Sequence, residues 1–379
     1  HMTKHETVIL GGGLAGLSAA FHLAGRAPLY EQQSSLGGLC RQVTVDGFRF
    51  DAVPHVLHFR HDATRELVHR LLDGRLHAYD RQARVYAHGT FLRYPFQAHL
   101  YGLPAEVIEE CVQGRLHAAR NGGPDLRTFE RWIVSTFGPG IARHFMVPYN
   151  TKFWTVPPSA LTCEWLDGLV PVPTVEQTVR GASTEDPTEY GYNVRFWYPE
   201  AGLGAITQAL LSRVPQIHLG KRLVRIETAA RHLRFADGGV VGYERLLSSI
   251  PLPELRRLLD PLPPEVERAL DRLRWTSLTV IHLGVRGSAL APWHWVYVPD
   301  AEFVFYRVGI PSHYAPHAAP DGFHLLSAEV SHAPEGGCDP HLLTQRVIRD
   351  LARLGLLRDA RDVSAQLALV VVLLAGAGL

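Results

Sequence analysis

The stretch from Thr7 to Leu23 constrains the fold of this chain more than any other. It begins with a short apolar run, Val8 to Leu10, and passes through Gly11-x-Gly13-x-x-Gly16 into a run rich in leucine and alanine. A strand, a glycine turn and a helix in this order are typical of a dinucleotide-binding turn. We therefore predict a Rossmann-type α/β fold built around it.

Each part of the turn has a physical role. Gly11 permits the tight turn out of the strand, Gly13 lets a pyrophosphate approach the backbone, and Gly16 lets the helix pack closely on the strand. The helix then opens with the backbone N–H groups of Leu14 and Ala15, and its positive end favours phosphate without a basic side chain. The alternative is an ordinary glycine-rich turn that binds no ligand.

A carboxylate follows at the distance that ribose binding requires. Glu31 closes the next predicted strand, Ala27 to Glu31, about 20 residues after the turn, and Gln32 comes directly after it. A second small-residue turn, Ser34 to Arg41, then includes Gly38 and Leu39. We expect both turns to contact the same cofactor.

The segment after the second turn indicates whether the cofactor is a flavin or a nicotinamide. Gly47 to His58 is similar to the flavoprotein pattern G-x-x-x-D-x-G-x-H, with Asp51 and His55 in place and Val53 where the second glycine would be. The cofactor that this resemblance implies is FAD.

Composition indicates a globular protein and excludes several other classes. The chain has 379 residues, of which 46% are hydrophobic and 20% charged, with a formal net charge of +1. This charge gives no electrostatic case for binding nucleic acid or an anionic membrane. The four cysteines are widely spaced without a C-x-x-C pair, which argues against a disulfide framework and a metal site.

No stretch reaches the 18 or so apolar residues of a membrane span. A charged N-terminus that runs straight into the first strand predicts a cytoplasmic location. A homo-oligomer is compatible with these features.

Hydrophobic periodicity predicts two interleaved domains. The FAD-binding domain comprises residues 3–60, 205–285 and 335–379. The substrate domain, built from helices and an antiparallel sheet, comprises residues 61–204 and 286–334.

The same periodicity predicts the individual elements. Predicted helices lie at 61–72, 105–119, 126–135, 205–212 and 341–356. Predicted strands lie at 83–86, 89–93, 216–219, 224–228, 232–235, 243–250, 275–284, 293–298, 302–308 and 323–329. Val224, which opens one of these strands, is included among the cofactor residues.

Tyr149, Lys152 and Trp154 lie within six residues of each other beside stiffening prolines. Aromatic faces and a cation could converge there on one ligand, or the rings could belong to the core beside a solvated lysine. Arg307 stands within an apolar strand, where an arginine needs a carboxylate or a ligand phosphate as partner.

The order of motifs, from Thr7 to about Asp362, resembles the flavoproteins related to UDP-galactopyranose mutase, within the amine oxidase and protoporphyrinogen oxidase group. Tyr149-x-x-Lys152-x-Trp154 is similar to the mutase segment that covers the nucleotide-sugar. The resemblance implies that His55 lies near the flavin ring, that Arg307 binds the sugar diphosphate, and that Tyr306 accompanies it at the substrate.

Two features depart from the mutases. They have an arginine shortly after the tryptophan segment, whereas Gly168 to Pro173 contains none. Their last strand and helix close over the flavin, whereas Gln366 to Leu379 has no charged side chain. Either the chain is truncated or its end is altered. We expect this tail to pack in part against the nucleotide domain and FAD to be held substoichiometrically.

These patterns predict a flavin-dependent mutase that converts a nucleotide-activated sugar between pyranose and furanose. In that chemistry, as the resemblance implies, reduced flavin acts at the anomeric carbon. The first alternative is a redox enzyme of the same fold, of the amine oxidase, protoporphyrinogen oxidase or desaturase type. The second is a non-catalytic relative that has lost its cofactor clamp.

Overall fold

The computed structural model describes residues 3–166, 168–334, 336 and 339–373. The chain consists of two compact units. The first unit comprises His1–Thr44, Arg49–His77 and Tyr198–Leu273, and the second comprises Val45–Phe48, Ala78–Trp197 and Arg274–Leu379. The division differs from the predicted domains in several places. Residues 61–77 and 198–204 belong to the first unit, whereas 45–48, 274–285 and the described part of 335–379 belong to the second.

The first unit contains a seven-stranded sheet in the order β13-β10-β11-β12-β1-β2-β9. Its strands are β1 (Thr3–Leu10), β2 (Leu29–Tyr30), β9 (Ile217–His218), β10 (Leu223–Glu227), β11 (His232–Phe235), β12 (Val240–Ser248) and β13 (Leu259–Asp260). β1 is parallel to both β2 and β12, and β2 is parallel to β9, whereas β10, β11 and β12 form an antiparallel meander. The predicted Rossmann-type arrangement is confirmed in this parallel part.

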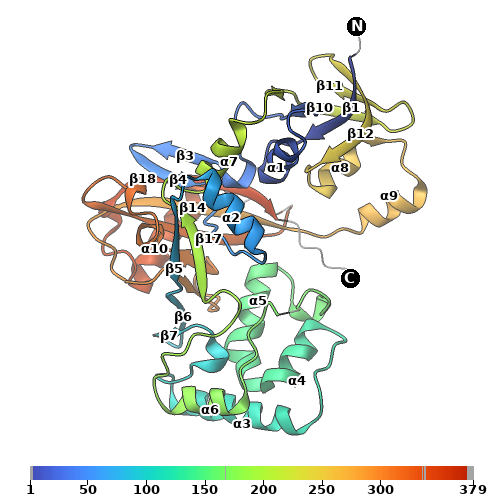
Figure 1. The fold of residues 1–379 in the computed structure, drawn as a ribbon. Helices are drawn as coiled ribbons and strands as arrows, with labels where there is room; N and C mark the ends of the chain where they lie inside the picture. Colours follow the sequence, from blue (N-terminus) through green and yellow to red (C-terminus); the bar gives the residue numbers. More distant parts are fainter. Residues whose placement is uncertain (1–2, 167, 335, 337–338, 374–379) are drawn as a thin grey trace. The chain divides into compact units, whose positions relative to one another are not determined.

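Burial explains why β1 is an inner strand. Its last three residues, Val8, Ile9 and Leu10, are all buried, as expected for a parallel strand that is covered on both faces. Helix α1 (Leu14–His22) follows the strand and packs against α7 (Gly204–Leu211), as Figure 1 shows. The remaining helices of the unit are α2 (Asp62–Leu71), α8 (Leu252–Leu258) and α9 (Pro264–Asp271).

The second unit contains another seven-stranded sheet, in the order β18-β14-β17-β16-β15-β6-β7. Its strands are β6 (Ala83–Ala87), β7 (Thr90–Arg93), β14 (Thr276–Arg286), β15 (Trp295–Tyr297), β16 (Arg307–Gly309), β17 (Phe323–His332) and β18 (Val363–Leu373). All of β14 except Arg286 is buried. Helix α10 (Pro340–Leu354) contributes Leu343, Val347, Leu351 and Leu354 to the core formed with this sheet.

The other helices of the second unit form a bundle beside that sheet, visible in Figure 1 as α3 (Ala105–Arg120), α4 (Phe129–Ile141), α5 (Val147–Trp154) and α6 (Val175–Ser183). Two glycines allow α3 and α4 to pack closely. A Cβ on Gly140 would lie 2.7 Å from the backbone of Glu110 and Cys111, and Gly138 has φ +81° at a kink. α4 begins after Thr128, whose hydroxyl accepts from Arg131 N–H, so it starts later than the predicted Leu126.

The strand predicted at 302–308 is largely wrong. Only Arg307–Gly309 forms a strand there, as β16. The Asp300 carboxylate accepts from the backbone N–H of Glu302 at 2.9 Å, and buried Asp350 accepts from that of Val304 at 3.0 Å. These bonds hold the segment in a turn, because Asp side chains compete with strand partners for backbone donors.

The uncharged tail packs in a different place from the one we predicted. Residues 363–373 form β18, which pairs antiparallel with β14 in the second unit rather than with the nucleotide-binding sheet. The reason is that β14 offers a long, regular row of backbone groups, from Thr276 to Val285, to a β-branched partner. β18 is an edge strand of the sheet, and Val370 is 59% exposed. Residues 374–379 of the tail lie outside the described residues.

Elements with weaker sequence signals also form. β3 (Gln42–Val45) pairs with β4 (Phe48–Asp51), and β5 (Leu76–Asp80) with β8 (Arg195–Pro199). Within the described part of the chain, no helix has the length and apolar character to span a membrane.

Candidate functional site

The glycine turn in the first unit is built almost entirely from backbone groups. Gly11, at φ +97°, donates its N–H to Tyr30 O at 2.9 Å, which joins the end of β1 to β2. A Cβ on Gly16 would lie 1.9 Å from the carbonyl oxygen of Gly11. Gly16 is therefore required for the fold itself, because α1 passes too close to the turn for any side chain.

Gly13 occupies a different environment. It precedes α1 with φ −75°, and a Cβ built on it would have Gly38 Cα, at 3.8 Å, as its nearest contact. Ordinary side-chain conformations and ordinary van der Waals distances would thus accommodate a methyl group. The role that remains for this glycine is to leave room for a ligand, which fits a pyrophosphate lying against the helix N-terminus.

The two small-residue turns contact each other. Gly37 donates its N–H to Gly12 O at 2.9 Å, and Gly13 forms an isolated parallel bridge with Gly37. No side chain caps the N-terminus of α1, so the first N–H groups of the helix have no such partner. Leu14 and Leu39 are 36% and 39% exposed beside them. A phosphate is the natural partner for these donors.

Glu31 is fixed by the same backbone. Its Oε2 accepts from Gly12 N–H at 2.7 Å and its Oε1 from Gln33 N–H at 2.8 Å. The carboxylate is thereby oriented at the carboxyl end of β2, and each oxygen keeps a further lone pair for a ribose hydroxyl. Gln32 follows at an exposed position, and Val224, 42% exposed, lies at a register shift in β10.

The segment after these turns holds a buried acid that the sequence did not single out as a site residue. The Asp51 carboxyl accepts from the Tyr198 hydroxyl, and burial raises its pKa to about 6 against the bonds from Tyr198, Gln42 and Leu203, which lower it. Val53, where the flavoprotein pattern has glycine, is 1% exposed. The side chain of His55 is exposed, and its backbone N–H donates to Val53 O at 2.7 Å.

In the second unit, Arg307 has a carboxylate partner. Its Nε and Nη2 donate to Glu329 at 2.5 and 2.8 Å, and the Tyr306 hydroxyl donates to the same carboxylate at 2.6 Å. Glu329 is 1% exposed and lies directly opposite Arg307 in the pairing of β16 with β17. Of the two partners that the sequence left open, the structure therefore shows the carboxylate, and Nη1 has no hydrogen-bond partner among the described residues.

Aromatic rings surround this ion pair. Tyr149 on α5 lies with its ring centroid 6.2 Å from that of Tyr306 and 5.6 Å from that of Tyr297. The ring centroid of Tyr94 lies 4.8 Å from that of Tyr297. Burial raises the pKa of Tyr94, Tyr149 and Tyr306 above the usual value, so these phenols are hydrogen-bond donors at any physiological pH.

Lys152 and Trp154 contact protein groups. Lys152 Nζ donates to the carbonyl oxygens of Val298 and Asp300 at 2.9 and 2.7 Å, which ties α5 to the segment after β15. Burial lowers the pKa of this amine to about 7. Trp154 packs against Trp165 with a centroid distance of 5.4 Å, and its buried Nε1 has no hydrogen-bond partner among the described residues.

Sequence reasoning missed Glu329, Tyr297 and a second buried arginine, Arg81. Arg81 has no exposed surface, donates to Glu189 at 2.6 Å and lies 4.7 Å above the ring of Tyr94. Each of these residues depends on a contact between strands or loops far apart in the chain. A charged residue inside an apolar strand was the available signal, and it pointed to Arg307 but not to its partner.

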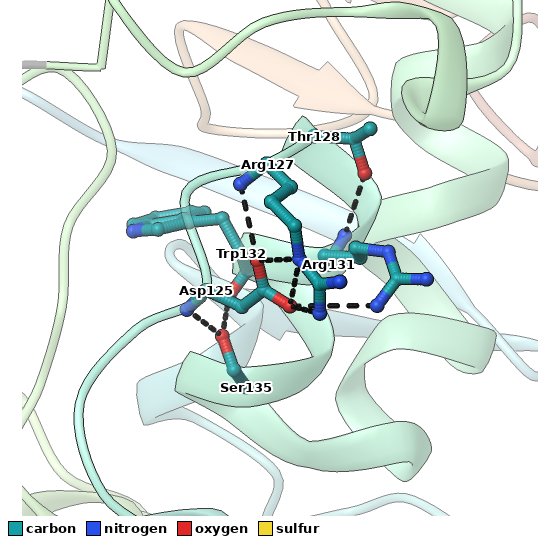
Figure 2. Close-up of polar contacts among 6 residues, drawn as sticks. All are labelled: Asp125, Arg127, Thr128, Arg131, Trp132 and Ser135. Carbon is teal, nitrogen blue, oxygen red and sulfur yellow. Dashed lines mark hydrogen bonds and ion pairs between the residues drawn. The ribbon is translucent and has the colours of Figure 1, made fainter.

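A second polar cluster, shown in Figure 2, is structural. The Asp125 carboxylate accepts from the backbone and side chain of Arg127 and from Arg131, while Asp125 N–H donates to the Ser135 hydroxyl. The hydrogen bond from the Arg127 side chain contributes most to lowering the pKa of the Asp125 carboxyl. This cluster holds the loop before α4 against the helix and presents no unpaired acid or base.

A family model described as flavin containing amine oxidoreductase matches residues 14–370. The chain belongs to this family. FAD is accordingly its cofactor, and the glycine turn, the uncapped start of α1 and Glu31 fit that molecule.

Two of the curated proteins that this chain resembles are a desaturase and an oxygenase. A zeta-carotene-forming phytoene desaturase of Myxococcus xanthus is 27% identical over 314 residues, which are 74% of this chain and 60% of the desaturase. A 4,4'-diaponeurosporene oxygenase of Staphylococcus aureus is 44% identical over 59 residues, or 15% of this chain and 12% of the oxygenase. The chain thus spans well under two thirds of the length of these relatives.

The solved structures that are similar to this chain include a mutase. Reduced UDP-galactopyranose mutase superposes with a TM-score of 0.88 at 27% identity, covering 98% of this chain and 83% of the mutase chain. A putative protoporphyrinogen oxidase from Exiguobacterium gives a TM-score of 0.72 at 19% identity, covering 99% and 88%, which supports the fold alone.

Proposed function

We propose that this chain is an FAD-dependent mutase that interconverts the pyranose and furanose forms of a nucleotide-activated sugar. The observation that carries the proposal is the polar character of the second unit's ring cluster. Tyr149, Tyr297 and Tyr306 lie near Arg307, and phenol groups suit sugar hydroxyls and phosphate better than a hydrocarbon. The 27% identity to the mutase structure supports the same assignment.

In this proposal the two units have separate tasks. Gly11, Gly13 and the start of α1 hold the FAD pyrophosphate, and Glu31 holds its ribose. Gln32, Gly38, Leu39 and Val224 complete the cofactor residues. Reduced FAD, when bound, supplies the nucleophile for the anomeric carbon, and we assign to His55 a place near its ring.

The substrate residues would bind and orient the nucleotide-sugar. Arg307 offers Nη1 to the diphosphate, while Glu329 fixes the plane of its guanidinium. Tyr149 donates to sugar or phosphate oxygens. The Tyr306 hydroxyl, whose proton goes to Glu329, can accept from a sugar hydroxyl, and Trp154 covers the base or the sugar. Lys152 acts through α5, because its ammonium group is already bound to two carbonyl oxygens.

One observation favours an oxidoreductase as the second candidate. The Glu329 carboxylate already balances the charge of Arg307, which weakens the attraction for a diphosphate. The sequence match to a carotene desaturase agrees with this alternative. Such an enzyme would use FAD as a hydride acceptor for an apolar substrate.

The test is an anaerobic assay of the purified protein with UDP-galactopyranose. A mutase forms the furanose isomer when the flavin is reduced with dithionite, shows little conversion when it is oxidised, and consumes no oxygen. Oxygen- or quinone-dependent turnover, with no isomer formed by the reduced protein, would establish the oxidoreductase instead. The flavin-to-protein ratio from the visible spectrum tests whether FAD is substoichiometric and identifies a non-catalytic relative, which would be colourless.

A further inference from the structure

A large groove in the first unit is lined by an unusual number of arginines. It has a volume of about 960 Å³ and lies among α2, α7 and the segment from Ser35 to Gln42. We name it the arginine groove after the five that line it: Arg41, Arg49, Arg70, Arg75 and Arg213. All of its lining residues belong to the first unit.

The charge of the lining is strongly positive. Asp73 is the one acid beside the five arginines among the lining residues that the structure describes. Asp73 lies 3.4 Å from Arg75, and Glu66, outside the lining, lies 4.0 Å from Arg70. These exposed pairs are weak and leave the field of the groove positive.

Two of the arginines contact uncharged partners. Arg41 Nη1 donates to the carbonyl oxygen of Gly38 at 3.2 Å, and Arg213 lies 5.8 Å from the ring centroid of Phe21. Such contacts position a guanidinium without neutralising it. The two groups come from distant parts of the sequence, so the fold brings their charges to one groove.

The lining also has an apolar part. Leu36, Leu71, Leu72, Leu211 and Leu219 line the groove together with alanines of α7. An organic group could contact these side chains while its anionic end meets the arginines, which is the usual composition of a small-molecule site.

We propose that the arginine groove binds a small organic diphosphate. One phosphate monoester carries about −1.5 to −2 charge at pH 7, so two phosphate groups match five arginines and one aspartate better than one does. Guanidinium groups recognise phosphate oxygens through paired N–H bonds. The groove is not the FAD site, because its lining includes neither the glycines of the first turn nor Glu31. The inference is independent of the proposed mutase activity.

The experiment is calorimetric titration of the FAD-loaded full chain with inorganic pyrophosphate, ADP and inorganic phosphate at low salt. We expect pyrophosphate and ADP to bind, phosphate to bind more weakly, and the double variant Arg70→Gln/Arg213→Gln to raise the dissociation constants for pyrophosphate and ADP roughly tenfold or more. Both side chains are exposed, and flavin content with circular dichroism checks that the variant is folded.

Two matched variants locate the binding. Arg245→Gln removes another exposed arginine of the first unit, 3.4 Å from Glu6, and we expect it to leave the affinity unchanged. Arg307→Lys weakens the proposed substrate site in the second unit, so pyrophosphate binding that persists in this variant and falls in Arg70→Gln/Arg213→Gln belongs to the groove. Failure of the mutase proposal would therefore not affect this result.

Several outcomes would overturn the proposal: no pyrophosphate binding, phosphate bound as tightly as pyrophosphate, or an equal loss in Arg245→Gln. Sedimentation with vesicles containing anionic lipid supplies a further arm. If vesicle binding requires Arg70 and Arg213 and pyrophosphate does not compete for it, the groove is a membrane-binding surface and not a diphosphate site.

Discussion

The glycine turn of the first unit and the Arg307 cluster of the second unit are built in opposite ways. The turn uses backbone N–H groups, small residues and one carboxylate, most of them close together in sequence. The cluster uses side chains from β16, β17, α5 and β15, which meet through tertiary packing. A cofactor site of the first kind can be recognised from a motif, whereas a substrate site of the second kind depends on its partners.

The largest effects are expected within the glycine turn, where two similar substitutions separate folding from binding. Gly13→Ala should abolish FAD binding and leave the circular dichroism spectrum unchanged, because the new methyl group meets only ligand space. Gly16→Ala should prevent folding, since its Cβ would lie 1.9 Å from a carbonyl oxygen. Soluble yield, circular dichroism and flavin absorbance measure both. A folded Gly13→Ala protein with full FAD would show that the pyrophosphate lies elsewhere.

Removing the carboxylate of Glu329 tests whether the cluster is an ion pair that stabilises the second unit. Glu329→Gln should destabilise the protein by about 3–5 kcal/mol, because Arg307 would keep a largely buried charge without a counter-ion. Urea denaturation reports the change. Arg307→Met combined with Glu329→Gln is the matched control, and it should recover part of the loss.

A buried acid in the first unit provides a contrast to Glu329. The pKa of Asp51 is raised from 3.8 to about 6, so ionisation of this carboxyl opposes folding. The stabilisation that the protonated carboxyl contributes is complete below pH 4 and is lost as the pH rises through 6. This loss corresponds to about 2–3 kcal/mol in the free energy of unfolding. Asp51→Asn should abolish it and be more stable than the wild type at pH 7. Equal pH profiles of the unfolding free energy in the two proteins would contradict the assignment.

Glu31→Ala tests the one side chain on which the backbone-built site depends. It should weaken FAD binding by about 1–3 kcal/mol, through loss of charge-assisted bonds to the ribose. Equilibrium dialysis of flavin measures the change, with exposed Gln33→Ala as the neighbouring control. Equal flavin occupancy in Glu31→Ala and the wild type would refute the ribose assignment.

The smallest expected effect concerns ligand binding by Arg307. Arg307→Lys should raise the dissociation constant for UDP roughly tenfold, or about 1.4 kcal/mol, with flavin content unchanged, since lysine cannot bind Glu329 through a planar fork and keep a further nitrogen for the ligand. Fluorescence titration with UDP provides the measurement. Unchanged UDP affinity, or no UDP binding by the wild type, would favour the oxidoreductase.

The sequence predicted much of the fold where its patterns are local. The hairpin at Ala83–Arg93 and the helices near 62–71, 105–120 and 340–354 form close to their predicted positions, because periodic burial and turn residues act over short distances. The 302–308 strand failed because Asp300 and Asp350 capture its backbone donors. The tail was misplaced because strand pairing is decided by which edge is available, and the residues of β14 that pair with the tail strand precede it by 78 to 97 positions, from Val285↔Val363 to Thr276↔Leu373.

By itself the sequence determined the strand, the glycine turn, the helix and the position of Glu31, since each depends on neighbouring backbone geometry. It also marked Arg307 as an arginine in need of a partner. Only the tertiary structure decided that this partner is Glu329, that Lys152 binds two carbonyl oxygens, and that five arginines line one groove. The physical reason is that charges and hydrogen bonds act through space, and their partners are fixed only when distant strands and helices pack together.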